Sequence, residues 1–171
     1  MELDKEIQEM LNRFLQELFS GNARIDNLYY NLQYKGYNNL ADAIHEPVAH
    51  VMGEWADEVS DLMDRLGYRP VRYAISFDYD KEYNVKQVFA DLLEYFNHLH
   101  TIVIKMIDKV DGDSDYKEIS IFLDDFLMNK ILPFRKQAQE WKLLSEKLEE
   151  EMFDMNISRH THYIGGGVNA L

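Results

Sequence analysis

Residues 38–67 read NNLADAIHEPVAHVMGEWADEVSDLMDRLG. Apolar side chains recur in this stretch at intervals of three and four residues, which predicts one buried face of an amphipathic helix. The two asparagines at its start can cap the helix, and Gly67 ends it. Pro47 lies inside the pattern, so we expect either a kink there or a true start near Glu46.

The same periodicity marks three further helices. Apolar residues at helical spacing run over residues 3–32, 85–110 and 119–148. The apolar residues before and after Ser20-Gly-Asn22 keep the same helical spacing, which favours one continuous first helix. Pro133, within the last of these stretches, predicts a second kink. Residues 68–83 show no helical period, so we expect a long connection between the second helix and the third.

Four predicted helices, joined by two short links and one long link, indicate an all-α fold. They define a ferritin-like four-helix bundle in which one long crossover joins the second helix to the third. We expect residues 1–152 to form this bundle and residues 153–171 to form an irregular C-terminal tail. The tail contains His160, His162 and the run Gly165-Gly-Gly167, for which a flexible segment is expected.

The composition excludes several classes of function. The chain has no cysteine, so any metal site must use carboxylate, imidazole, phenolate or amide groups. With 18 basic and 31 acidic residues the net charge is -13, which makes nucleic acid an unlikely partner. No apolar run is long enough to span a membrane, and the acidic N-terminus lacks the order of a signal peptide. We therefore expect a cytoplasmic protein without membrane contact.

Candidate metal ligands lie on the side of the second helix that faces away from its apolar stripe. At about 100° per residue, the apolar stripe centres on Val48. The opposite side carries Glu46, His50, Asp57 and Asp61. This outward side is either an ordinary solvated face or half of a metal site that a second subunit completes across a two-fold axis. An iron pair inside the bundle is poorly supported.

The segment His45-Glu-Pro-Val-Ala-His50 is similar to a zinc protease motif but is one residue too long. Five residues turn an α-helix by about 500°, so the two imidazoles would point about 140° apart. On an unbroken α-helix, His45 and His50 are therefore expected not to share a metal ion.

A short motif in the second helix indicates a family. Asp57-Glu-Val-Ser-Asp61, followed by Leu66-Gly67 and Pro70, is similar to an Asp-x-x-x-Glu motif that supplies two iron ligands in the mini-ferritins. Over roughly residues 5 to 150 the chain resembles this family, the Dps proteins (DNA-binding proteins from starved cells). The resemblance implies a homo-oligomer, a dodecamer built from two-fold dimers, with an iron-oxidising site between two subunits.

The resemblance implies a set of iron ligands that two subunits share. The candidates are Asp57, Asp61, Glu46, Asp42, His45, His50 and Tyr30. Asp57 and Asp61 would come from one subunit and the others from its partner. The family's first-helix histidine falls at Tyr30 or Asn31, and its glutamate is here the shorter Asp61. An ungapped alignment places the partner's histidine and aspartate at Asp42 and Glu46, whereas a three-residue shift makes His45 the histidine.

The implied activity is that of a ferroxidase. Ferrous iron would be oxidised by oxygen or peroxide and stored as ferric mineral in the shell, which protects against oxidative stress. The basic N-terminal arm that many members use on DNA is replaced by Met1-Glu-Leu-Asp4, so DNA binding is not implied. The alternatives are a ferritin-like bundle with a degenerate metal site that acts as a structural or binding module, and a helical partner protein that presents Tyr29, Tyr34 and Tyr37.

Overall fold

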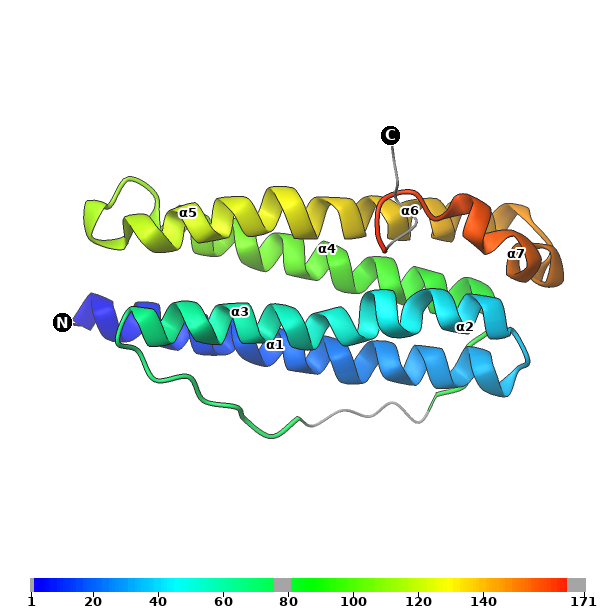
Figure 1. Ribbon diagram of the computed structural model, residues 1–171, viewed down its shortest axis with the longest axis horizontal. Coiled ribbons are helices and arrows are strands. Elements are labelled where there is room, and N and C mark those ends of the chain that lie inside the picture. The colour runs from blue at the N-terminus through cyan, green and yellow to red at the C-terminus, as the bar shows by residue number, and fades with distance from the viewer. Residues whose placement is uncertain (1, 76–80, 166–171) are drawn as a thin grey trace.

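The computed structural model describes residues 2–75 and 81–165, and every regular element within them is a helix (Figure 1). The predicted all-α class is confirmed. In chain order the elements are α1 (Glu2–Tyr34), α2 (Asn38–Ile44), η1 (His45–His50), α3 (Val51–Arg65), α4 (Val85–Val110), η2 (Ser114–Tyr116), α5 (Lys117–Phe126), η3 (Leu127–Ile131), α6 (Leu132–Lys147), α7 (Glu150–Asn156) and η4 (Ile157–His160).

Five helices, α1, α3, α4, α5 and α6, pack together around one apolar core. α1 contacts α3 and α4, and α4 contacts α5 and α6 (Figure 1). The predicted apolar stripes form the core, since side chains such as Leu11, Leu18, Val59, Leu92 and Leu99 are fully buried. The spacing of apolar residues thus marks the face that each helix buries. No helix in the described part of the chain is long and apolar enough to cross a membrane.

α1 continues without a break through Gly21, as the unchanged apolar phase predicts. Gly21 faces Tyr95 of α4, and a Cβ atom on Gly21 would overlap the Tyr95 hydroxyl group. That hydroxyl donates a hydrogen bond of 3.1 Å to the backbone carbonyl of Glu17. Gly21 therefore permits α1 and α4 to approach closely at this point.

Both internal prolines lie in or directly after a π-helix, whose turns are wider than those of an α-helix. Pro47 lies within η1, and Pro133 follows η3 at the start of α6. η1 and η3 are π-helices, in which backbone hydrogen bonds span five residues. Proline lacks an N–H group, and in an α-helix its ring clashes with the carbonyl four residues earlier. At both expected kinks the wider π turn relieves this clash.

Two asparagine side chains hold the non-helical connection between α3 and α4 on α1. Asn12 donates a hydrogen bond of 3.2 Å to the carbonyl of Arg69 and accepts one of 2.8 Å from the backbone N–H of Val71. Asn31 makes the same pair of bonds with the backbone of Tyr83, at 2.6 and 3.0 Å. The connection is therefore bonded to α1 near both of its ends.

The C-terminal segment differs from the predicted irregular tail. Residues 153–160 are helical, in α7 and η4. Phe153, Ile157 and Ile164 are buried, so the segment packs onto the other helices. Three apolar side chains are too few to establish a helical period in the sequence, which is why the prediction is wrong for these residues. Residues 166–171, which include Gly166 and Gly167, lie outside the described residues.

Gln137 of α6 holds the chain that follows η4. Its buried side chain donates a hydrogen bond of 2.7 Å to the carbonyl of His160. Its Oε1 atom accepts bonds of 2.7 and 3.0 Å from the backbone N–H groups of His162 and Tyr163. One buried amide thus satisfies three backbone groups of the C-terminal segment.

We expect Gly21→Ala to destabilise the protein, because the added methyl group meets Tyr95. Overpacking of this kind lowers the free energy of unfolding by about 1–3 kcal/mol. Gly53→Ala in α3 is the matched control, since nothing lies within 4 Å of its Cβ position. Replacing this helical glycine should raise stability by about 0.5–1 kcal/mol. Urea unfolding measures both variants, and equal stabilities would contradict the close contact.

We expect Gln137→Ala to loosen the C-terminal segment, because it leaves three backbone groups without their partner. Losing such buried bonds costs about 1–3 kcal/mol. Hydrogen exchange at the amides of His162 and Tyr163 measures the effect, and both should exchange faster. The control is Gln139→Ala, an exposed position on the same helix. The clamp is refuted if the two variants exchange alike.

Candidate metal centre

Three metal-ligating side chains converge between α1 and η1. Asp26 comes from α1, whereas His45 and His50 come from η1. One carboxylate oxygen of Asp26 and one ring nitrogen of each histidine all lie within 4.8 Å of one another. Within residues 2–75 and 81–165, this is the one such group of three or more histidine or acidic side chains. We refer to these three residues as the Asp26 group.

The π-helix brings His45 and His50 to the same side of the chain, which corrects the expectation from the sequence. In η1 the hydrogen bonds span five residues, so positions five apart lie one above the other. The two ring centroids are 4.4 Å apart, and the ring planes meet at 64°. The expectation that these imidazoles point apart applies to an unbroken α-helix, and residues 45–50 form a π-helix instead.

Side chains next to the Asp26 group fix α1 against η1. Asn22, one turn before Asp26, donates a hydrogen bond of 2.6 Å to the carbonyl of Ala49. Tyr29, three residues after Asp26, stacks on the His45 ring with centroids 3.9 Å apart and an angle of 7° between the planes. These contacts set the spacing between the two helices and the plane of the His45 ring.

The electrostatic environment of Asp26 suits a bound cation. Burial raises the pKa of the Asp26 carboxyl group, and positive charge on His50 and His45 acts in the opposite direction. The Oδ1 atom is buried and has no hydrogen-bond partner in the described chain. A buried oxygen without a partner is costly, and a metal ion would satisfy it. His50 is exposed, so the group is open to solvent on that side.

The donor set indicates which metals fit. Two imidazole nitrogens and one carboxylate oxygen, with positions left open, are typical of non-haem Fe(II) sites. Zn²⁺ accepts the same types of ligand. Ca²⁺ and Mg²⁺ prefer oxygen ligands. The Asp26 group therefore fits a divalent transition-metal ion.

Of the predicted ligands, the structure brings together His45 and His50. The side chains of the others are exposed: Tyr30, Asp42, Glu46, Asp57 and Asp61. In the part of the chain that the structure describes, none of these carboxylates belongs to a group of three potential ligands. Their predicted role requires a second subunit, so it stays a prediction.

Sequence reasoning does not single out Asp26. The residue lies beside Ile25 on the edge of the apolar stripe of the first helix, where it is half-buried. Carboxylates are uncommon in such positions unless they have a partner, which is a weak signal for a site. The stronger signal is Pro47 between two histidines, because a proline inside a helical pattern indicates an irregular turn.

No protein-family model and no curated protein matches this chain. The described residues form an all-helical protein that carries a group of two histidines and one carboxylate.

We expect Zn²⁺, used as a probe, to stabilise the folded protein through the Asp26 group. At a free concentration of about 100 times Kd the gain is about 2.7 kcal/mol. For a chain of this size that gain raises Tm by roughly 5–10 °C. Asp26→Asn combined with His50→Gln should lose the shift in calorimetry. Asp57→Asn combined with Asp61→Asn should keep it, and loss of the shift in this second pair alone would contradict the assignment.

Proposed function

We propose that this protein binds ferrous iron at the Asp26 group and promotes its oxidation, as a ferroxidase. The observation that carries the proposal is the convergence of the donor atoms of Asp26, His45 and His50 within 4.8 Å of one another. The unpartnered Oδ1 atom of Asp26 adds support, because it offers a buried acceptor for a cation. Ferrous iron takes this donor set and leaves positions free for water or an oxidant.

Each residue of the group has a distinct role in this proposal. His45 and His50 bind through neutral ring nitrogens, so iron displaces any proton that they carry there. The Asp26 carboxylate supplies negative charge, which favours the ferric over the ferrous state. Each ferrous ion gives up one electron. Two such electrons and two protons convert one molecule of hydrogen peroxide into two molecules of water.

The charge of the whole chain supports a cationic substrate. The net charge is -13, and a field of that sign raises the local concentration of cations and their rate of encounter. His50, exposed at the edge of the Asp26 group, is the ligand that an incoming ion would meet first.

The fold that we propose is a ferritin-like four-helix bundle with one long crossover. It is supported by the packing of α1 on α3 and of α4 on α6, and by the non-helical connection between these pairs. The resemblance to the mini-ferritins adds a cytoplasmic, homo-oligomeric shell that stores ferric mineral and protects against oxidative stress. Light scattering tests the shell, since a dodecamer has about twelve times the mass of one chain.

A second iron site, between two subunits, is favoured by Asp57 and Asp61. They lie one turn apart on the exposed side of α3. Among the described residues, neither carboxylate has a hydrogen-bond or ion-pair partner. The resemblance to the mini-ferritins implies that Glu46 and Asp42 of a partner subunit would complete this site.

Anaerobic titration with ferrous iron, followed by addition of oxygen or peroxide, tests the proposed function. The wild type should bind iron and oxidise it faster than buffer does. In Asp26→Asn combined with His50→Gln we expect the oxidation rate to fall by at least about tenfold. Asp57→Asn combined with Asp61→Asn serves as the matched pair, because it removes two exposed carboxylates and keeps the Asp26 group.

The pattern of rates separates the candidate functions. A rate lost only in the first pair supports the Asp26 group, and a rate lost only in the second supports the site between subunits. A wild type that oxidises iron no faster than buffer refutes the ferroxidase. The chain would then be a bundle with a degenerate site, acting as a structural or binding module.

A further inference from the structure

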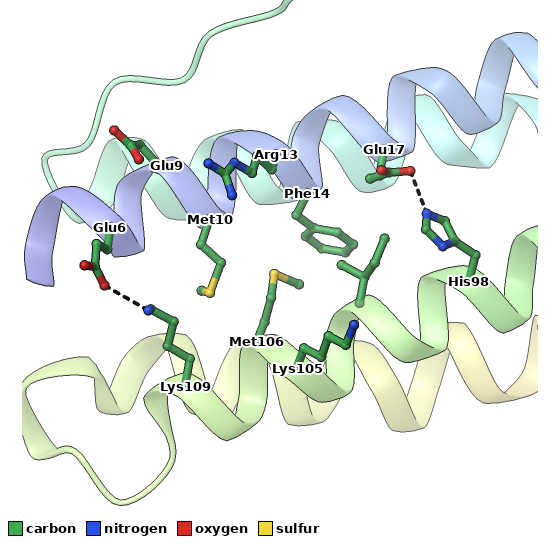
Figure 2. A pocket seen from close by; sticks show the side chains of 11 residues that line it. Glu6, Glu9, Met10, Arg13, Phe14, Glu17, His98, Lys105, Met106 and Lys109 are labelled. Atoms are coloured by element: carbon green, nitrogen blue, oxygen red, sulfur yellow. Dashed lines mark hydrogen bonds and ion pairs between the residues drawn. The ribbon is translucent and has the colours of Figure 1, made fainter. Parts of the chain in front are cut away.

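Contacts between acidic and basic side chains connect α1 with α4 along an open seam on the surface. The Glu6 carboxylate lies 2.9 Å from the Lys109 ammonium group, and the Glu17 carboxylate lies 3.2 Å from Nε2 of His98 (Figure 2). All four side chains are substantially exposed. In both contacts the acid is on α1 and the base on α4.

The same register continues along the two helices. Arg24 of α1 forms a bidentate ion pair with Asp91 of α4, at 2.9 and 2.6 Å. In all three contacts the two residue numbers add up to the same value. α1 and α4 are therefore antiparallel, and in each contact an acidic and a basic side chain face each other across the seam at equal heights.

A groove separates α1 from α4 between the first two contacts. Its volume is about 630 Å³, and its floor is formed by Met10, Phe14, Ile102 and Met106 (Figure 2). Methionine and phenylalanine are enriched in protein–protein interfaces. The groove therefore offers an apolar strip with charged residues along both edges.

Among the described residues, three charged side chains that line the groove lack a partner, and one of them, Arg13, lies one turn after Glu9 on α1. Glu9 lies on the α1 edge and Lys105 on the α4 edge, and both are exposed (Figure 2). Across the described residues neither has an ion-pair or hydrogen-bond partner. By the register of the seam, they lie within one residue of the same height.

We propose that a second copy of this chain docks on the α1/α4 face, about a two-fold axis that runs parallel to the seam. This rotation places α1 of one copy over α4 of the other at the same height. Glu9 of each copy then lies opposite Lys105 of its partner, which forms two ion pairs that the single chain does not make among its described residues. Glu6 and Lys109 join their symmetry mates in a ring of alternating charges.

The size of the face agrees with a stable dimer. α4 has 26 residues and α1 runs beside it, so the seam is about 39 Å long. Two helices about 10 Å wide then give a face of about 800 Å² per copy, which is the standard size for a specific interface. The proposal uses neither the Asp26 group nor the ligands Asp57 and Asp61, and it holds or fails independently of iron oxidation.

Complementary charge reversals test this interface. Glu9→Lys places lysines on both edges of the groove, and Lys105→Glu places acids on both edges. Each variant alone would set like charges against each other twice per dimer, so we expect its dimer dissociation constant to rise at least tenfold. An equimolar mixture restores both cross-subunit pairs, and its dissociation constant should return close to that of the wild type. Analytical ultracentrifugation of metal-free protein measures all three samples.

The controls and the contrary outcomes are equally specific. Lys136→Glu on α6 and Glu151→Lys on α7 change the net charge by the same amounts at exposed positions away from the seam, and should leave assembly unchanged. Circular dichroism confirms that every variant is folded. The proposal fails if the wild type stays monomeric at its highest soluble concentration. It fails equally if either reversal assembles like the wild type, or if the mixture assembles no better than its parts.

Discussion

The close contact between Gly21 and Tyr95 fixes the middle of α1, and the other features of the structure depend on that position. Because Gly21 has no side chain, the Tyr95 ring of α4 lies against the backbone of α1. The next residue, Asn22, bonds to the carbonyl of Ala49 in η1. Two consecutive residues therefore tie α1 to both of its neighbours. One turn later, Asp26 reaches the two histidines.

The Asp26 group shows how backbone hydrogen bonding can create a site without changing the apolar pattern of a helix. Val48 and Ala49 in η1 are buried, as residues of a helical stripe should be. The π turn changes which polar side chains share a side, because it aligns positions five apart instead of four. His45 and His50 meet for this reason. π turns inside longer helices are frequent at functional sites, and η1 holds two of the three residues of the Asp26 group.

Periodicity alone predicts the four long helical stretches, because the burial of a helix face depends on local spacing. Leu18 and Leu99 are buried as their spacing indicates. The Asp26 group cannot be predicted in this way, because Asp26 is far from the histidines in sequence. In addition, the angle of about 100° per residue in an α-helix would place His45 and His50 on different sides. The helical segment 153–160 is missed for a related reason. Its placement depends on apolar contacts with other helices and on a clamp from Gln137, which no local pattern records.

The π turn at residues 45–50 also bears on how the gene could change. A π turn contains one residue more than an α turn, so deleting a single codon in this segment would be enough to restore an ordinary α-helix. The faces of α2 and α3 would keep their present relation. If the lost residue lay between the histidines, these would stand four apart and would still share one side of the α-helix. The reverse step, a one-codon insertion between two histidines four apart in a plain helix, would give the spacing found here and keep the pair together. The pairing of His45 with His50 is thus compatible with a conventional helix that is one residue shorter.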